Sequence, residues 1–585
     1  MPTADRLAAP AAPEETIVAS QPDTPADILA RAIADEKVHL SGYSPGSQAI
    51  TLELVRALDR LFMSEVVEPK PHGVEERLHR RIMEWGMNEA LLRALPPSLS
   101  DAPFKLFPST PERQDQVDEF LFRCGTLTLA EQMAEWLREG LVSAEYRRHE
   151  SEDRPVLRAL VLRTADPSLG DEVIGRSGLA WESSLKTLRN RARERELALR
   201  HREVERELES RCVLLDGFVP FCPIDEPLCD FFEECAAVYL DRIFAQDMLG
   251  PDDRIGGFPF RDYLDTVRVL SGRQHRHLAM LRVLRRRHPE ADLRNLLTHQ
   301  AQAEELHAYV ALRRGISPEI AERLLEPLTL SPGNLELHLR SRDPVWPSLI
   351  RTNKGTYIEP LFGLDINPYL FLAKSLRGAF EDEWSVLANR RERRWIEEME
   401  SLFAGSRLQT VARSTMLRQD GRDVTDIDFT AYDGQNGDLL LFQLKWQQPV
   451  GADDAARRSM GSNLIRTGNK WVAAVEGWIA EHGISELMRR LGLKISAEPR
   501  IRLFVVARYN AHFGGRSGRD DRAVWTSWAH FRKAWQHRSK RPTKDLVNFL
   551  RRQATEAKRR SGERTLTFPI NDVTVLLNPR KVPKR

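Results

Sequence analysis

Apolar residues recur three and four positions apart over much of residues 26–365, and this spacing places them along one side of an α-helix. It predicts helices over Leu52–Val66 and Glu75–Leu95. A further helix start is predicted at Thr110-Pro111, because a threonine side chain caps free N–H groups and proline suits the first helical turn. We therefore expect residues 26–365 to form a predominantly helical region, of one or two subdomains.

Some segments of this half depart from helical spacing. Val156–Leu162 fits a strand or a short buried helix, because so short an apolar run has no diagnostic period. Pro347–Phe362 predicts a small hairpin that turns at Asn353-Lys354-Gly355. A helix followed by a hairpin is also the plan of a winged-helix DNA-binding unit, but we favour an ordinary connector. Residues 1–25, rich in Ala, Pro and Thr, predict a flexible tail.

The segment Leu179–Cys212 predicts a long helix that is dense in Arg and Glu. Its leucines are spaced too irregularly for a sustained heptad, so we favour a solvated helix packed on its own domain over a coiled-coil dimer. A homo-oligomer or a protein partner bound through the helical region stays open. The cysteines that follow lack the tight C-x2-C pair of a zinc site and are better interpreted as buried thiols. They are Cys212, Cys222, Cys229 and Cys235.

Strand and helix patterns alternate in the last third of the chain. Arg390–Phe403 predicts a helix with Glu392 on its apolar stripe, where an unpaired carboxylate is costly. Leu408–Ser414 predicts a strand, Leu464–Ile479 an amphipathic helix, and Ile501–Ala507 a buried strand. Further predicted elements are helices at Trp525–Trp535 and Lys544–Lys558 and a strand at Thr565–Leu577.

Between the first strand and the amphipathic helix, Thr425–Gln447 predicts two strands joined by a turn. Alternation of side chains places Asp426 and Asp428 on one face of the first strand, and Gln443 and Lys445 point the same way on the second. An Asp beside a Gln and a Lys suits a divalent metal facing a phosphate or a polarised water. The plainer alternative is a surface hairpin with solvated charges at its ends.

Composition adds limits rather than a function. The chain has 585 residues with 41% hydrophobic and 29% charged content, and no run approaches the roughly 18 to 20 apolar residues of a membrane span. Without a leader pattern or a disulfide framework, the expected location is the cytoplasm and no membrane partner is expected. The net charge of +2 is uninformative, but basic clusters at His530–Lys544 and Arg551–Arg564 would suit a polyanion.

The predicted order of helix, three strands, helix and strand, with Asp428 followed by Gln443-Leu444-Lys445, resembles the PD-(D/E)xK nuclease superfamily. It is most similar to members such as the Mrr-like restriction enzymes, which use Gln-x-Lys in place of Glu-x-Lys. The resemblance covers Phe380–Ala507, within a nuclease-like domain expected at residues 378–585. The proline of the superfamily's name is absent here.

The resemblance implies a restriction-endonuclease-like α/β fold with an αβββαβ core and a mixed sheet. It also implies a Mg²⁺ or Mn²⁺ site formed by Asp428, Gln443, the main-chain carbonyl of Leu444 and Glu392. Lys445 would orient a water molecule or stabilise charge on the phosphate. Glu398 is kept as an alternative to Glu392, since it lies nearest to the same stripe.

The implied activity is metal-dependent hydrolysis of DNA phosphodiester bonds, with restriction or anti-phage defence as its expected setting. Arg466, Lys470 and Trp446 are weaker candidates for contact with nucleic acid. The same residues would serve a nuclease that acts on RNA. They are also compatible with an inactive relative that only binds nucleic acid as part of an assembly.

Overall fold

The structure is a computed structural model, and it describes residues 23–43, 48–66, 73–102, 104–151, 154–164, 191–217, 219–223, 225–241, 247–340, 347–364, 367–447, 454–495, 497–511, 518–560 and 565–578. The predicted tail lies outside these residues except for residues 23–25, as does the predicted helix Leu179–Cys212 before residue 191. The chain is mixed α/β, with helices and several small sheets. None of the helices in the described ranges is both long and apolar enough to cross a membrane.

The predicted helices of the first 140 residues are confirmed, and they pack on one another around a shared apolar core. The third and fourth approach very closely, because a Cβ atom at Gly86 would lie only 2.3 Å from the carbonyl oxygen of Leu121. Thr110 caps the fourth helix by accepting a hydrogen bond from the N–H of Arg113, with Pro111 in the first turn as expected. The four are α1 (Pro25–Ser41), α2 (Gln48–Val66), α3 (Val74–Ala94) and α4 (Pro111–Arg138).

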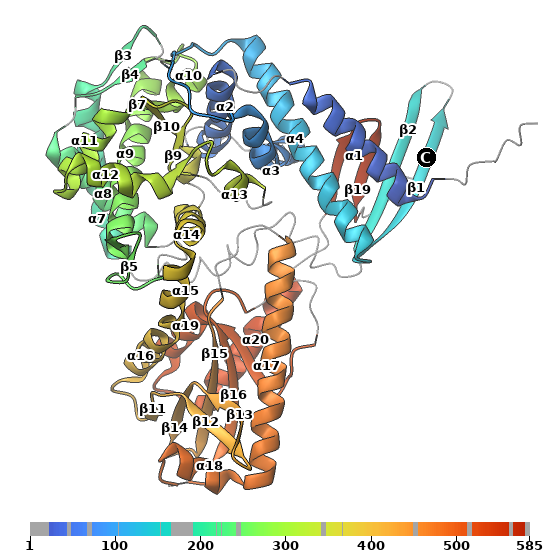
Figure 1. The fold of residues 1–585 in the computed structure, drawn as a ribbon, viewed down its shortest axis with the longest axis vertical. Coiled ribbons are helices and arrows are strands. Elements are labelled where there is room, and N and C mark those ends of the chain that lie inside the picture. Colours follow the sequence, from blue (N-terminus) through green and yellow to red (C-terminus); the bar gives the residue numbers. More distant parts are fainter. Residues whose placement is uncertain are drawn as a thin grey trace, which may run out of the picture.

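The middle of the chain adds a second helical lobe (Figure 1). Its helices include α7 (Arg191–Arg211), α8 (Glu226–Leu240), α9 (Phe260–Arg287), α10 (Leu293–Leu297), α11 (Ala303–Arg314), α12 (Pro318–Leu325) and α13 (Leu335–Leu339). Two short strand pairs lie beside them, β3 (Val213–Leu215) with β4 (Val219–Phe221), and β5 (Arg254–Ile255) with β6 (Phe258–Pro259). Leu197 and Leu208 of α7 are buried against the neighbouring helices, as a helix packed on its own domain requires.

The predicted hairpin near residues 347–362 is confirmed as β9 (Leu349–Arg351) and β10 (Thr356–Glu359), which pair antiparallel. It belongs to a larger sheet with the order β7-β10-β9-β8, completed by β7 (His299–Gln302) and β8 (Thr329–Leu330). Every residue of β10 is buried, so this strand does not form an exposed wing. The connector interpretation therefore fits better than a winged helix.

The C-terminal lobe holds a five-stranded sheet in the order β11-β14-β15-β16-β17. The first three strands are antiparallel neighbours, whereas β15, β16 and β17 run parallel. The strands are β11 (Gln409–Val411), β14 (Phe429–Asp433), β15 (Asp438–Lys445), β16 (Arg500–Ala507) and β17 (Ala523–Ser527). A separate pair is formed by β12 (Thr415–Gln419) and β13 (Arg422–Ile427). The helices are α14 (Pro368–Ala379), α15 (Glu381–Asn389), α16 (Arg391–Phe403), α17 (Asp454–His482), α18 (Ile484–Leu491), α19 (Trp528–Arg538) and α20 (Thr543–Arg560).

Both faces of the central strands are covered, as the apolar run in β15 predicted. Alternate residues such as Leu441 pack against α17 through Trp471, and their neighbours such as Phe442 pack against α16 and α19. Two predictions need correction here. The segment Thr425–Tyr432 is not one strand, because β13 and β14 belong to different sheets. The predicted helix at Trp525–Trp535 begins only at Trp528, since the residues before it form the buried edge strand β17.

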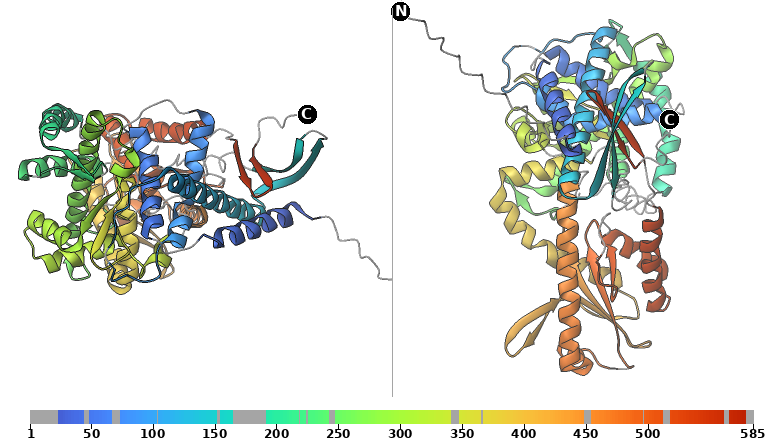
Figure 2. Two further views of the ribbon diagram at one scale, coloured as in Figure 1. Left: turned by 90° about the horizontal axis from the view of Figure 1, so that it is seen from above. Right: turned by 90° about the vertical axis from the view of Figure 1, so that its right-hand side faces the viewer.

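The last strands of the chain return to its beginning. The single strand predicted at Thr565–Leu577 is a hairpin of β18 (Leu566–Ile570) and β19 (Val573–Leu577). This hairpin does not decorate the C-terminal sheet. Instead, β19 pairs parallel with β2 (Arg154–Thr164), which itself pairs with β1 (Val142–Ser151). Figure 2 shows these red strands against the cyan ones, and the ambiguous segment Val156–Leu162 is therefore a strand.

Candidate functional site

The candidate site, formed by Asp428, Gln443, Leu444 and Lys445, lies where β14 diverges from β15. The N–H of Asp428 still donates to the carbonyl of Phe442, at 3.0 Å. Beyond that point a side chain replaces the main-chain hydrogen bond between the strands, because Oδ2 of Asp428 accepts the N–H of Leu444 at 2.6 Å. The same oxygen accepts a hydrogen bond from the side-chain amide of Gln443. The structure thus brings Asp428 and Gln443 together, as the sequence predicted.

The other oxygen of this carboxylate has a different environment. Oδ1 of Asp428 is buried and has no hydrogen-bond partner among the described residues, and the whole residue is only 1% exposed. Burial raises the pKa of Asp428 to about 7, and the charges of Asp426 and Glu392 act in the same direction. The N–H of Leu444 and the ammonium of Lys445 partly oppose this rise. An acceptor left unpaired in a buried position costs free energy unless a cation or a donor occupies it.

Lys445 lies at the end of β15 and is partly exposed. Its ammonium forms no hydrogen bond or ion pair with any residue that the structure describes, although its charge acts on Asp428. Its main-chain carbonyl accepts the N–H of Arg508 at 3.0 Å. A lysine in this setting has its ammonium available for an incoming anion. Asp428 and Lys445 therefore face the same neighbourhood with complementary charges.

The position of Glu392 differs from the prediction. The buried face of α16 consists of Arg391, Trp395, Met399 and Phe403, which repeat every four residues. Glu392 lies one step around the helix from this face and is exposed. Its charge still acts on Asp428, so it lies near the site but not on the apolar stripe.

The alternative carboxylate, Glu398, is already paired. Its two oxygens accept hydrogen bonds from the guanidinium of Arg508 at 2.8 and 2.9 Å. Arg508 also donates to Asp247 of the preceding lobe at 2.5 Å. Of the two glutamates, Glu392 is consequently the one whose carboxylate has no ion pair among the described residues.

Asp426 belongs to β13, whereas Asp428 lies in the bend between β13 and β14. Its carboxylate accepts a hydrogen bond from the hydroxyl of Ser414 at 3.2 Å, and its main-chain carbonyl accepts one from the indole N–H of Trp471 at 2.7 Å. These contacts tie the site to α17. Asp426 still influences Asp428 electrostatically, so it is a close neighbour although the strand that was expected to connect them is interrupted.

The weaker nucleic-acid candidates occupy two places. Arg466 and Lys470 are exposed on α17, and Arg466 donates to the side chain of Asn463 at 2.8 Å. Trp446 directly follows Lys445 and contacts Trp395 edge-on, with ring centroids 5.6 Å apart. The guanidinium of Arg508 lies 4.4 Å from the centroid of the Trp446 ring.

Two arginines that contact Trp446, Arg391 and Arg508, were not among the site residues predicted from the sequence. Arg391 and Arg508 are both buried against Trp446, which lies far from each of them in the sequence. No local spacing of residues therefore marks these arginines. The one available signal was an arginine directly before Glu392 on a helix that carries an inward-facing tryptophan.

The metal-binding capacity of the site depends on groups other than clustered carboxylates. Within the described ranges, no group of three or more His, Cys, Asp or Glu side chains is arranged to hold a metal ion. Oδ1 of Asp428 has no hydrogen-bond partner among the described residues. Gln443 and Leu444 both donate to Oδ2 of Asp428, and they would add an amide oxygen and a main-chain carbonyl. Carboxylate, amide and carbonyl oxygens are the ligands that hard cations such as Mg²⁺ prefer. The five cysteines are free thiols, of which Cys222 and Cys235 are partly exposed.

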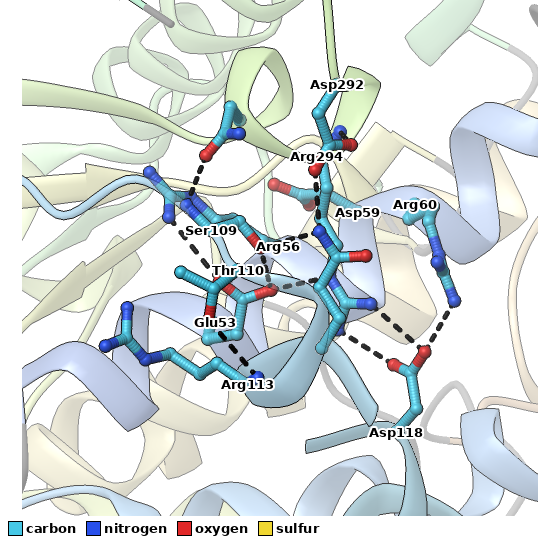
Figure 3. Close-up of polar contacts among 12 residues, drawn as sticks. Glu53, Arg56, Asp59, Arg60, Ser109, Thr110, Arg113, Asp118, Asp292 and Arg294 are labelled. Atoms are coloured by element: carbon cyan, nitrogen blue, oxygen red, sulfur yellow. Dashed lines mark hydrogen bonds and ion pairs between the residues drawn. The ribbon is translucent and has the colours of Figure 1, made fainter. Parts of the chain in front are cut away.

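A second cluster of buried charge lies between α2 and α10 and is shown in Figure 3. Nε of the fully buried Arg294 lies 2.6 Å from Glu53, and its terminal nitrogens donate to Asp118 at 2.8 and 3.0 Å. Arg56 donates to the carbonyl of Phe107 at 2.6 Å. These guanidiniums and carboxylates pair with one another, so the cluster stabilises the packing of α2, α4 and α10. It has no unpaired carboxylate among the residues shown in Figure 3.

Comparisons with models of protein families, with curated proteins and with solved structures found no match to this chain. The residues of the candidate site are therefore the basis on which a function is inferred.

Proposed function

We propose that the C-terminal lobe is a nuclease of the PD-(D/E)xK type that hydrolyses DNA phosphodiester bonds with Mg²⁺ or Mn²⁺. The observation that carries the proposal is the buried, unpartnered Oδ1 of Asp428 beside Gln443 and Lys445. The order of α16, β11, β14, β15, α17 and β16 supports it, because it is the order of the αβββαβ core that the sequence resembles when the pair β12 and β13 and the short helix α18 are treated as insertions. The restriction-endonuclease-like fold is part of the same proposal.

The residues of the site carry the oxygen atoms that a hard cation such as Mg²⁺ prefers as ligands. Asp428 would offer Oδ1, Leu444 its carbonyl, and Gln443 its amide oxygen after a half-turn of the amide. A bound cation would polarise a phosphate and lower the pKa of a water molecule. Glu392, whose charge acts on Asp428, would be the further carboxylate that approaches the cation from the exposed side. Loss of the Gln443 hydrogen bond would leave Asp428 held by the N–H of Leu444.

Lys445 has a separate role in the proposal. Its ammonium can donate to a phosphate oxygen, where it would stabilise the negative charge that grows as the phosphodiester bond breaks. Gln443 is neutral where most members of the superfamily have a carboxylate, so it repels an incoming phosphate less. A lower metal affinity is the expected cost of this substitution.

The test is cleavage of plasmid DNA with Mg²⁺ and with Mn²⁺. We expect Asp428→Asn and Lys445→Met each to reduce the cleavage rate by about 10²-fold or more, because each removes a group that acts on the reacting phosphate. Asp423→Asn is the matched control, since this carboxylate lies in the same lobe but is exposed and paired with Arg418. It should cleave at the rate of the native protein.

Two results would sink the proposal. One is a native protein that cleaves neither DNA nor RNA, single- or double-stranded, with either metal. The other is normal cleavage by both Asp428→Asn and Lys445→Met. Running RNA substrates beside DNA distinguishes the two nuclease activities, and restriction or defence as the setting rests on the resemblance alone.

A further inference from the structure

The first turns of α16 place two arginines, Arg391 and Arg394, on adjoining positions of one helix face. Arg391 is only 5% exposed, and its guanidinium lies 4.9 Å from the ring centroid of Trp384 and 5.9 Å from that of Trp446. Burial is the largest cause that lowers the pKa of Arg391, and the charge of Arg394 lowers it further. Arg391 is thus largely desolvated beside a like charge, whereas the side chain of Arg394 is 27% exposed.

Both guanidiniums have the same unused edge. On Arg391 and on Arg394, Nε and Nη2 are buried and have no hydrogen-bond partner among the described residues. These two nitrogens form the side-on fork with which arginine binds a carboxylate or a phosphate through two parallel hydrogen bonds. The nearest carboxylate, Asp253, lies 3.5 Å from Nη1 of Arg394, which is outside that fork.

The free-energy cost of burying these guanidinium nitrogens favours an anion as their ligand. A buried guanidinium without a partner destabilises the folded protein more than one that is bound to an oxyanion. Further buried donors without a partner among the described residues lie close by, namely the indole N–H of Trp446 and the side-chain amide of Gln447. Polar groups of this kind are normally satisfied, so their concentration points to a ligand rather than to packing.

The arginine pair adjoins the candidate site. Trp446, under the guanidinium of Arg391, directly follows Lys445, and Glu392 beside Arg391 acts electrostatically on Asp428. A phosphodiester held at Asp428 and Lys445 is followed along its strand by further phosphates. The fork geometry matches a phosphate, and the neighbouring site favours a nucleic acid as its source.

We propose that Arg391 and Arg394 form a phosphate-binding subsite that holds a backbone phosphate of the nucleic acid next to the scissile one. This inference rests on the proposed function for its ligand, but it assigns residues that act in binding rather than in hydrolysis. It therefore predicts a loss of affinity that does not depend on the metal.

The test measures binding of a fluorescent DNA duplex by anisotropy in EDTA, where no cleavage occurs. We expect Arg391→Met and Arg394→Met each to weaken binding about tenfold, the usual size for a charge-assisted hydrogen-bonded contact. Each should also lower the slope of log affinity against log salt by about 0.9, because one phosphate contact is lost. Arg393→Met is the matched control, since its side chain is 88% exposed and its guanidinium pairs with Glu397.

Thermal unfolding of the same variants separates binding from structure. A buried guanidinium without a partner does not stabilise the free protein, so Arg391→Met should unfold at the native temperature or higher. A structural role would lower that temperature instead. If Arg391→Met fails to fold, Arg394→Met, which is less buried, decides the outcome.

Affinity and salt slope equal to those of the native protein, in a folded variant, would overturn the subsite. Its failure is distinguishable from that of the nuclease proposal. A native protein that binds DNA through Arg391 but never cleaves it keeps the subsite and loses the nuclease. If the native protein cleaves DNA while both variants bind it normally, the nuclease proposal stands and the subsite is refuted.

Discussion

At the scale of single residues, hydrogen-bond partners distinguish a structural carboxylate from a functional candidate. Burial raises the pKa of both Asp59 and Asp428 to about 7. Both oxygens of Asp59 are satisfied, because Oδ1 accepts the N–H groups of Leu361 and Phe362 and Oδ2 accepts the hydroxyl of Thr298, all at 2.8 Å. Oδ1 of Asp428 has no hydrogen-bond partner among the residues that the structure describes, so an unsatisfied oxygen and not a raised pKa marks the candidate site.

Asp59 makes folding depend on pH. Its pKa is about 7 in the folded protein and close to 3.8 when unfolded, so the folded state binds the proton more tightly between these values. Its contribution to stability is therefore greatest below about pH 4 and declines up to about pH 7, with a slope of at most about 1.4 kcal/mol per pH unit. We expect Asp59→Asn to remove this decline, as measured by urea unfolding from pH 5 to 8.

An exposed carboxylate supplies the control for this prediction. Asp101 is largely solvent-exposed, and Asp101→Asn should leave the pH dependence as it is in the native protein. A pH profile of Asp59→Asn that coincides with the native profile would contradict the assignment of Asp59.

At the scale of elements, α17 is fixed across the C-terminal sheet by one close contact. A Cβ atom at Gly468 would lie 2.3 Å from the Trp525 ring of β17, so the helix can approach the sheet only because this residue has no side chain. Trp471, one turn further along, then reaches the main chain of Asp426. The position of α17 beside the candidate site thus depends on a single glycine.

Two glycines of α17 should respond in opposite directions to alanine. Gly468→Ala is expected to lower the free energy of unfolding by about 1–3 kcal/mol, because the added methyl group forces the helix and sheet apart. Gly477→Ala adds a methyl group with nothing within 4 Å, so it should raise that free energy by about 0.4–1 kcal/mol. Chemical denaturation of both variants tests the contact, and an equal effect at the two positions would refute it.

At the scale of the whole molecule, the chain closes on itself. The C-terminal strands β18 and β19 complete the sheet that β1 and β2 begin, and their apolar residues share a core with α1 and α4. Arg458 of α17 adds ion pairs to Glu135 of α4 and to its C-cap residue Glu139, at 3.1 and 3.3 Å. The C-terminal lobe is therefore linked to the first lobe by strand pairing and by charge (Figure 1).

Removal of the last strands should damage the beginning of the protein. A chain that ends after residue 560 would leave the edge of β2 without a partner and expose apolar residues of the shared core. We expect faster hydrogen exchange across Val142–Thr164 and a melting temperature lower by several degrees. A chain that ends after residue 578 retains both strands and should behave as the native protein, and unchanged exchange in the shorter chain would contradict the proposed closure.

Local pattern was sufficient for the elements and for the central pair of the site. Helix caps, the hairpin at residues 347–362 and the doubly buried strand β15 follow from neighbouring residues. Asp428 and Gln443 meet because Asp428 directly precedes β14 and Gln443 lies near the end of β15, and these strands are joined by a short turn whose pairing follows from the sequence. Each of these features depends on residues close together in the sequence, so its period or spacing can be recognised in the sequence.

Tertiary structure decided what depends on distant partners. Glu398 pairs with Arg508, 110 positions away, and Arg158 of β2 contacts Asp572, 414 positions away. The exposure of Glu392 and the burial of Arg391 depend on how α16 packs against Trp446 and Trp384, because one helical step separates an inward side chain from an outward one. Contacts between distant residues have no period in the sequence. Only the folded chain shows that Oδ1 of Asp428 and the Nε and Nη2 atoms of Arg391 and Arg394 have no hydrogen-bond partner among the described residues.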